Sequence, residues 1–496
     1  MSSENNSLNQ IIKHRLEKLN KIKDAGINPF PYNYTSTHKV VEILNNQENL
    51  LDSHVSISGR IVSFRKMGKV SFIHIQDESS KLQVYAKSDI LPEGIYDNVV
   101  RNLDLGDILG ISGKLFITKM GELTVKATGL EILSKNIRPL PNLKEKDGEA
   151  FNAFEDKELR YRHRHLDLIA NPEVMDVFKQ RAKIISQLRV ELDSRDYIEV
   201  ETPVLQNIYG GASARPFTTF HNTLEQKLYL RIADELYLKR LIIGGFTKVY
   251  EIAKNFRNEG MDRNHNPEFT ALEFYQAYAD LYEMMELTED IIHNVAKVIN
   301  KKVLEFSGHK IDISQKFNRK SMFSLLNEAT NKTVDKMDSQ ALFELAKGKN
   351  INVDKSMNYG QLLDSIFGAL VEPSLVEPTF VTDYPKAISP LAKVSRDGSP
   401  EIVERFELFI GGMEFANSFT ELNDPIEQRN RLEAQSKLRD LGDDEAQVVD
   451  EEFLLAMETG MPPTGGVGIG VDRLVMLLTE QNSIKDVLLF PAMRPE

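Results

Sequence analysis

Between residues 55 and 132, apolar and polar side chains alternate in five short runs, and glycine marks several of the breaks between them. Because successive side chains of a β-strand point to opposite faces, such a run predicts a strand with one buried side. Five short strands joined by glycine-marked turns are typical of a small closed β-barrel. We therefore expect a five-stranded barrel in the first third of the chain.

The outer face of this barrel carries groups that suit a nucleic-acid base. In "VSFIHIQ" the alternation turns Ile73 and Ile75 one way and Phe72 the other. Arg65 and Gln83 are expected beside Phe72, which gives the stacking ring, cation and amide edge that a single-stranded base requires. Barrels of this OB type bind several kinds of ligand, however, and a lone exposed phenylalanine is usually without function. Both interpretations stay open on these residues alone.

The length and composition limit the domain number and the cellular location of the protein. Its 496 residues favour two or three domains, and the absence of cysteine excludes disulfides and thiolate metal sites. No apolar run approaches the roughly 20 residues of a membrane span. The N-terminal residues predict an amphipathic helix and not a secretion signal. A cytoplasmic location is therefore the default expectation.

Charge is distributed unevenly along the chain. The formal net charge is −13, yet residues 1–140 carry 18 Lys and Arg against 15 Asp and Glu. A mildly basic N-terminal third is compatible with a nucleic-acid partner at that end, without demonstrating one. The helix expected at residues 8–24 fits a solvated surface helix and a phosphate-contacting helix equally well.

Shifts in composition also divide the chain. Residues 136–151 are rich in Pro, Gly and charge, which favours a linker. After them, strands and helices follow in an order that favours an α+β domain on an antiparallel sheet over repeated βαβ units. We expect a helical extension at 1–52, the barrel at 53–137, a linker at 138–160 and a large domain at 161–496 with a mainly helical insertion at about 288–372.

The glycine-rich stretch "TGGVGIGVDRLVMLL" superficially matches a dinucleotide-binding fingerprint. It lies too close to the C-terminus for the second strand and acidic residue of that unit, and the chain contains no GxxxxGK[ST] phosphate loop. The stretch indicates instead a bare strand on which a ligand can lie flat, followed by a helix from about Val471. Arg473 then falls in the first helical turn, where the helix dipole disfavours a cation unless a ligand brings an anion.

A second polar stretch, "RFELFIGGMEFANSFTELND", brings Glu407, Glu414 and Glu421 onto neighbouring strand segments. Carboxylates so placed repel one another unless a divalent cation or a cationic substrate lies between them. Surface charge is the alternative, which the apolar flanks disfavour. The two histidines of "YRHRHLDL" have no third ligand in sight, so we expect no zinc site.

Three patterns together resemble one family. "YIEVETPVL", then "FRNEG" with "HNPEFTALEFYQAY", then "GGVGIGVDRLVMLL" resemble motifs 1, 2 and 3 of the class II aminoacyl-tRNA synthetases, in that order. A preceding OB barrel marks the subgroup that charges aspartate, asparagine or lysine. Within it, "GGASARPF", "RIADELYLKRL", "FVTDYPKAISPLAK" and "ANSFTELNDP" resemble the lysyl-tRNA synthetases of the bacterial type, and the similarity covers nearly the whole chain.

The resemblance implies a homodimeric enzyme that activates lysine with ATP and transfers it to tRNA, with Mg²⁺ as cofactor. It implies Arg257 and Arg473 as catalytic cations. The implied ATP-binding residues are Arg257, Glu259, Arg263, His265, Asn266, Phe269, Glu407, Gly470 and Arg473. The implied lysine-binding residues are Gly211, Glu235, Arg257, Glu273, Tyr275, Asn417, Phe419 and Glu421. Glu407 and Glu414 are the implied Mg²⁺ ligands, and Arg65, Phe72 and Gln83 the implied anticodon readers.

Within these sets the resemblance assigns separate tasks. Glu235 with the Gly211 backbone would hold the α-ammonium of lysine, and Glu421 with the Tyr275 hydroxyl the ε-ammonium. Phe269 would lie beneath the adenine with Arg473 above it, and Arg473 and Arg263 would take the γ-phosphate. The role of Glu273 beyond its negative field stays open.

Three rival hypotheses remain. An aspartyl or asparaginyl enzyme of the same fold is disfavoured because a pocket for aspartate needs a cation, and these residues are acidic. A related enzyme that attaches lysine-type groups to a protein is disfavoured by the anticodon barrel. A nucleic-acid-binding regulator with an inactive synthetase domain is disfavoured because Arg257, Glu407, Glu414 and Arg473 are all present.

Overall fold

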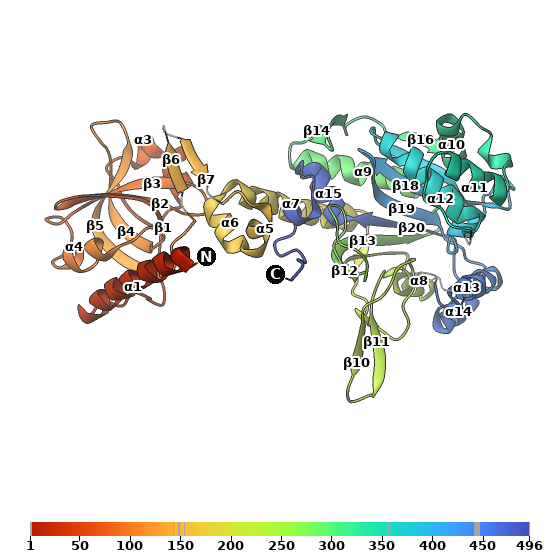
Figure 1. Cartoon of the computed structure of the whole chain (residues 1–496), viewed down its shortest axis with the longest axis horizontal. Coiled ribbons are helices and arrows are strands. Elements are labelled where there is room, and N and C mark those ends of the chain that lie inside the picture. The colour runs from red at the N-terminus through yellow and green to blue at the C-terminus, as the bar shows by residue number, and fades with distance from the viewer. Residues whose placement is uncertain are drawn as a thin grey trace. The chain divides into compact units, whose positions relative to one another are not determined.

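The computed structural model describes residues 2–141, 143–146, 149–152, 154–355, 357–440 and 447–495 (Figure 1). The chain divides into two compact units, Met1–Pro172 and Glu173–Glu496. In the described residues, no helix is long and apolar enough to span a membrane.

The first unit contains a closed barrel of five strands in the order β1-β2-β3-β5-β4. Its strands are β1 His54–Met67, β2 Val70–Gln76, β3 Lys81–Lys87, β4 Ile108–Ile117 and β5 Leu123–Ser134. β3 and β5 pair in parallel, and the remaining neighbours are antiparallel. Ile73, Ile75 and Val84 are fully buried inside, as the alternation predicted. The expected closed barrel is therefore confirmed.

The rest of the first unit contains one long helix, several short helices and one hairpin. These elements are α1 Ser2–Asp24, α2 Val40–Asn45, α3 Gln47–Leu50, α4 Ile95–Asn98, η1 Val100–Asn102, β6 Leu143–Lys146, β7 Glu149–Asn152, α5 Lys157–Arg162 and α6 Arg164–Ala170. The helix α1 buries Leu19 and Ile22, and Ile22 joins the barrel core, whereas Ile11 and Leu16 are exposed. Residues 142, 147–148 and 153 of the predicted linker lie outside the described residues.

The second unit is built on an eight-stranded sheet in the order β16-β17-β18-β19-β20-β13-β12-β8. Its strands are β8 Ile198–Glu199, β12 Lys248–Phe256, β13 Glu268–Ala277, β16 Asn318–Ser321, β17 Thr379–Pro385, β18 Ile402–Ile410, β19 Met413–Thr420 and β20 Thr464–Gly470. Only the two outermost pairs, β16 with β17 and β8 with β12, are parallel. This largely antiparallel sheet confirms the α+β class. The glycine-rich strand β20 lies between β13 and β19, antiparallel to both, so no dinucleotide-binding βαβ unit forms there.

The sheet has one apolar face and one polar face. Leu272 and Phe274 of β13, with Val467 and Ile469 of β20, belong to a large core that also contains residues of four helices (Figure 1). These helices are α7 Glu173–Asp193, α9 Leu281–Val298, α15 Val471–Leu478 and the short α16 Ile484–Val487. Because side chains alternate along a strand, the residues between those four apolar residues point to the opposite face. That face carries the polar residues described below.

Smaller elements complete the second unit. They are β9 Leu205–Gln206, β10 Thr218–His221, β11 Gln226–Leu230, α8 Glu235–Ile243, β14 Val303–Phe306, β15 His309–Asp312, α10 Met322–Thr330, η2 Val334–Lys336, α11 Ser339–Gly348, α12 Tyr359–Leu370, η3 Glu372–Ser374, η4 Lys386–Ile388, α13 Pro425–Asp440, α14 Glu451–Glu458 and α16 Ile484–Val487. The segment predicted as a mainly helical insertion holds α10, α11 and α12 together with β14, β15 and β16. These three helices share a separate hydrophobic core with β17 and β18.

Candidate active site

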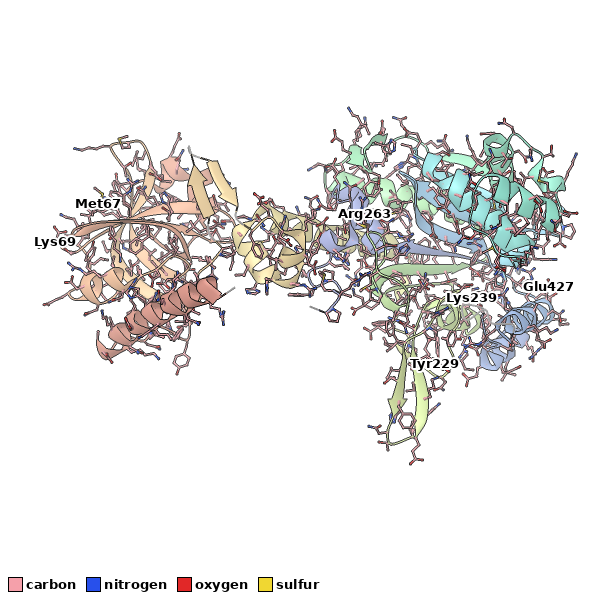
Figure 2. All side chains as sticks on the ribbon, viewed as in Figure 1. Met67, Lys69, Tyr229, Lys239, Arg263 and Glu427 are labelled. Carbon is pink, nitrogen blue, oxygen red and sulfur yellow. The ribbon has the colours of Figure 1, made fainter. Side chains whose placement is uncertain are left out.

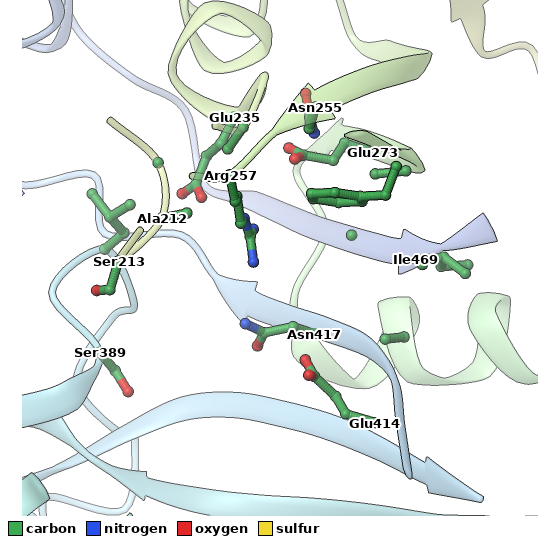
Figure 3. Close-up of a pocket in the computed structure, with 18 of the residues that line it drawn as sticks. Ala212, Ser213, Glu235, Asn255, Arg257, Glu273, Ser389, Glu414, Asn417 and Ile469 are labelled. Atoms are coloured by element: carbon green, nitrogen blue, oxygen red, sulfur yellow. The ribbon is translucent and has the colours of Figure 1, made fainter. Parts of the chain in front are cut away.

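A cavity of about 730 Å³ opens on the polar face of the sheet (Figure 3). Its floor follows one row of the sheet, in which Glu273 of β13, Gly468 of β20 and Asn417 of β19 are direct neighbours. Gly466 and Gly468 present backbone alone to the cavity, which leaves room for a flat ligand. The bare strand expected from the glycine pattern is therefore found in the cavity floor.

Arg257 projects into this cavity from the end of β12 (Figure 3). β12 and β13 form an antiparallel pair, and the loop between them joins "FRNEG" to "HNPEFTALEFYQAY". The Arg257 backbone N–H donates to the carbonyl of Pro267 at 2.9 Å, which closes the loop between them. Its guanidinium lies 5.1 Å from the centre of the Phe269 ring. The arginine is thus held over an aromatic side chain, with its charge directed at the cavity.

Two buried carboxylates face one end of the cavity, and a buried lysine joins them. Glu235 is the first residue of α8, and Glu421 follows β19. The Lys239 ammonium lies 2.5 Å from Oε1 of Glu235 and forms an ion pair with Glu421 as well. All three side chains are buried. The sequence analysis identified both carboxylates and missed the lysine between them.

A second acidic group lies beside the first. The Tyr275 hydroxyl donates to Glu273 at 3.0 Å, and the Asn255 amide donates to Asp234 at 3.0 Å. Burial raises the pKa of Glu273 well above its ordinary value, and the neighbouring Asp234 and Glu235 raise it further. Burial likewise raises the pKa of Asp234 to about 6. Glu273 and Asp234 together therefore keep a proton near neutral pH. Because the Tyr275 hydroxyl donates its hydrogen to Glu273, its oxygen is available to accept a hydrogen bond from a ligand.

Two glycines allow these side chains to approach the ligand space. A Cβ on Gly466 would lie 2.3 Å from Oε1 of Glu421 and 2.3 Å from the Tyr275 ring. Gly211 has φ +85°, and a Cβ there would lie 3.1 Å from the Cβ of Glu235. A larger residue at either position would displace an acidic group of the cavity.

Arg473 and Glu414 form the opposite, more open part of the cavity. Arg473 lies in the first turn of α15, which begins at Val471 as expected. Its Nη1 lies 3.2 Å from a carboxylate oxygen of Glu414, and its Nη2 lies 3.1 Å from Nε2 of His265. The start of the helix is anchored by Asp472, whose carboxylate accepts from the backbone N–H of Thr270 at 2.7 Å. Arg473 is therefore held at the cavity by the fold itself.

Glu407 is a neighbour of Glu414, but it is not among the residues that line the cavity. It accepts from the Tyr384 hydroxyl at 2.8 Å and pairs with Arg405. Burial raises the pKa of Glu407 to about 7, and Arg405 opposes this shift while Glu414 adds to it. In the described residues, no group of three or more His, Cys, Asp or Glu side chains forms a metal cluster.

Most of the other residues predicted for the site line the same cavity. These are Gly211, Glu235, Glu259, His265, Asn266, Phe269, Glu273, Tyr275, Asn417, Phe419, Glu421 and Gly470. Arg263 is the second exception beside Glu407: its Nη2 donates to the carbonyl of Asn482 at 3.1 Å (Figure 2). Arg405, which the sequence analysis missed, also lines the cavity and lies opposite Phe419 in the sheet register.

On the barrel, Arg65 pairs with Phe72 and Phe72 with Tyr85 across three strands. The rings of Phe72 and Tyr85 meet edge to face at 5.4 Å. Gln83 was expected to offer a free amide edge, but it is only 8% exposed. Its amide donates to Glu122 at 2.5 Å. β5 runs beside β3 in a parallel pairing that the sequence pattern did not reveal, and this brings Glu122 over Gln83.

Comparison with known families agrees with this architecture. Residues 156–494 match the tRNA synthetases class II (D, K and N), and residues 55–133 match the OB-fold nucleic acid binding domain. The first match covers more than half of the chain, so the chain belongs to the class II tRNA synthetases of the D, K and N group. The family inferred from the three motifs is confirmed.

Three individual proteins with similar sequences are all named lysine–tRNA ligases. A lysine–tRNA ligase of Carboxydothermus hydrogenoformans is 48% identical over 494 residues, which are 99% of each chain. A lysine–tRNA ligase of Pelotomaculum thermopropionicum is 48% identical over 499 residues, which cover 100% of this chain and 97% of the relative. A lysine–tRNA ligase of Christiangramia forsetii is 48% identical over 490 residues, 97% of this chain and 86% of the relative.

Proposed function

We propose that this chain is a lysine–tRNA ligase, which activates L-lysine with ATP and transfers the lysyl group to tRNA. The observation that carries the proposal is the buried pair Glu235 and Glu421, which share one cavity with Arg257 and Arg473. Carboxylates suit the two ammonium ions of lysine, and guanidinium groups suit the phosphates of ATP. The full-length similarity to lysine–tRNA ligases supports the same substrate.

In the first step, a carboxylate oxygen of lysine attacks the α-phosphorus of ATP, and the bond to the β-phosphate oxygen breaks. Lysyl-adenylate forms and pyrophosphate leaves. The nucleophile is already an anion, so the step needs no general base. The protein contributes positioning and charge neutralisation. We assign Arg257 to the lysine carboxylate and the α-phosphate, since its guanidinium projects into the cavity from a fixed loop end.

For the amino acid, we assign Glu235 and the Gly211 backbone to the α-ammonium and Glu421 and the Tyr275 hydroxyl to the ε-ammonium. Tyr275 donates its own proton to Glu273, so its oxygen is oriented as an acceptor. This assignment also gives Glu273 a task, which is to orient the tyrosine. Asn417 and Phe419 complete the wall.

For the nucleotide, we assign the adenine to Phe269, with Glu259, His265 and Asn266 around it and Gly470 below. Arg473 is assigned to the terminal phosphates. Glu414 and Glu407 fit Mg²⁺, because Glu414 raises the pKa of the buried Glu407 carboxyl and a divalent cation would relieve that repulsion. When bound, Mg²⁺ would neutralise phosphate charge.

In the second step, a hydroxyl of the terminal ribose of tRNA attacks the lysyl carbonyl and AMP leaves. We assign anticodon recognition to the barrel, with Phe72 as the stacking ring and Arg65 as the cation beside it. Gln83 would act together with Glu122, which holds its amide. The proposal also includes that the protein acts as a homodimer and is located in the cytoplasm.

An aspartate substrate fits the cavity poorly. Its side-chain carboxylate would need an available cation, and Lys239, the cation at that end, is enclosed between two carboxylates. Exchange of labelled pyrophosphate into ATP, measured with each amino acid in turn, tests the proposal. Lysine should drive the exchange, and aspartate and asparagine should not. Exchange driven by another amino acid, or by none, would contradict it.

A further inference from the structure

Lys239 is a buried ammonium for which the reaction described above has no use. It lies on α8 (Figure 2). It follows Glu235 by one turn, so both side chains leave the same face of the helix. Its side chain is 1% exposed, and it does not line the cavity. It contacts instead the two carboxylates that do, from the side away from the ligand space.

Burying an ammonium carries a large desolvation cost, which two carboxylates offset here. Burial lowers the pKa of Lys239, but Glu235 and Glu421 together raise it above its ordinary value. The lysine is therefore charged. A buried ion pair of this kind adds little stability compared with well-packed apolar side chains, so stability alone does not account for it.

We propose that Lys239 is a specificity-determining positioning residue. Its ammonium holds the carboxylates of Glu235 and Glu421 in fixed positions apart from each other, and it keeps Glu421 able to bind an ammonium ion of the substrate. The inference rests on the proposed function, because it takes lysine as the amino acid. Lys239 itself touches neither substrate. It acts through the two carboxylates.

The surroundings of Glu421 show why a fixed cation is needed. Glu235 and Lys239 face it from α8, and Tyr275 with Glu273 approaches from β13. Burial raises the pKa of Glu421 to about 8, Lys239 opposes that shift, and Glu235 adds to it. Without Lys239 the carboxyl would hold its proton more tightly. The proton would then occupy the group that must accept the ammonium.

The test compares Lys239→Met with wild-type protein in lysine-dependent pyrophosphate exchange between pH 7 and pH 9. Methionine keeps the length of the side chain and removes the charge. We expect KM for lysine to rise roughly 100-fold at pH 7, because one partner of a buried charge cluster is lost. KM for ATP should stay within about threefold. The ratio of mutant to wild-type KM cancels titration of the substrate itself.

The pH profile separates a positioning role from a merely structural one. Between the wild-type pKa of about 8 and the higher pKa of the variant, Glu421 of the variant should lose its extra proton, so the lysine KM ratio should shrink by about tenfold per pH unit in that range and stay constant below it. Arg240→Met is the matched control, since Arg240 is the next residue of α8 and pairs with Asp450 at 2.9 Å. It should leave the profile unchanged.

Three outcomes would overturn the inference: a lysine KM equal to that of wild type, a lower one, or an equal loss for lysine and ATP at every pH. If Lys239→Met does not fold, Lys239→Arg decides. It keeps the charge but displaces it, so KM for lysine should rise about tenfold with an unchanged pH profile, and a wild-type KM would again refute the inference. Should lysine fail to drive exchange in wild-type protein, the proposed function itself would be wrong.

Discussion

At the end of the cavity proposed for the amino acid, charge is enclosed and already partnered, whereas at the end proposed for the nucleotide it is exposed. Glu235 and Glu421 share the buried Lys239, and Glu273 holds the Tyr275 hydroxyl. At the nucleotide end, the side chains of Glu414 and His265 are 40% and 52% exposed. One end is organised before a substrate arrives, and the other is open to water.

The difference indicates how the two substrates are selected. Buried charges interact through a low effective dielectric, so small differences in substrate charge have large consequences at the amino-acid end. Exposed charges at the nucleotide end are screened and gain strength only when a ligand excludes water. On the proposed assignment, the fixed end selects the amino acid, and the triphosphate would be bound by groups that the ligand brings together.

The largest expected effect comes from Arg257, the residue that serves both ends. Arg257→Ala should lower kcat/KM for lysine-dependent pyrophosphate exchange by about 1000-fold, because charge developing on the α-phosphate loses its fixed cation. The loss should appear for ATP and lysine alike. A change in KM for one substrate alone would show that Arg257 belongs to one end only.

Arg263→Ala is the matched comparison for Arg257. Arg263 is exposed and donates to the carbonyl of Asn482, outside the cavity. Its loss should change exchange by no more than about threefold if this placement persists with ATP bound. A loss as large as that of Arg257→Ala would show that the loop carries Arg263 onto the nucleotide.

Glu421→Gln tests the enclosed end alone. The variant should raise KM for lysine roughly 100-fold and leave KM for ATP nearly unchanged, since the amide keeps the shape and removes the charge that faces an ammonium. Glu427→Gln is the control, because Glu427 pairs with Arg431 on α13 and does not line the cavity. Equal effects on both substrates would remove the distinction between the two ends.

Much of the cavity could be predicted from local pattern, because its residues alternate along strands. The apolar residues of β13, Leu272 and Phe274, fixed which face Glu273 and Tyr275 must take. The glycines of β20 likewise indicated a close backbone approach. These features depend on neighbours within one strand, which is the range over which a sequence pattern carries information.

What the sequence did not reveal depends on contacts between distant segments. Glu235 and Lys239 have the spacing of an ordinary surface ion pair on a helix, and only the position of Glu421 shows that the pair is buried. Glu122 covers Gln83 through a parallel strand pairing, and Arg263 is held outward by Asn482. No local pattern encodes which segment will pack against such residues.

The free energy of unfolding should depend on pH in a direction set by two buried carboxyls, one at each end. Glu421 and Glu407 have raised pKa values, about 8 and about 7, against 4.5 for an ordinary glutamate. Between pH 5 and 7, the folded protein holds protons that the unfolded chain has lost, so the free energy of unfolding should fall as pH rises. Each group contributes up to about 1.4 kcal/mol per pH unit.

Urea unfolding at pH 6, 7 and 8 measures this slope. Glu421→Gln should be less sensitive to pH than wild-type protein, because it removes a carboxyl whose proton affinity differs between the folded and the unfolded state. Saturating lysine should stabilise the wild-type protein at pH 8 and should stabilise the variant less. Stability that is flat or rising between pH 6 and 8 would contradict the raised pKa values.

A smaller effect than those of Arg257 and Glu421 is expected outside the cavity, on the barrel. Phe72→Ala removes the ring that Arg65 and Tyr85 flank, and loss of one stacked base costs about 1–3 kcal/mol. We expect kcat/KM for tRNA in aminoacylation to fall roughly tenfold. Pyrophosphate exchange should be unchanged, because that step involves the residues of the cavity alone.

Phe30→Ala is the control for a general loss of aromatic surface, since Phe30 is an exposed aromatic residue of the first unit that lies outside the five strands. It should alter neither assay. If Phe72→Ala lowered exchange as much as aminoacylation, the barrel would influence activation itself. The contrast between the two ends of the cavity would then be incomplete, because a third region would control the same step.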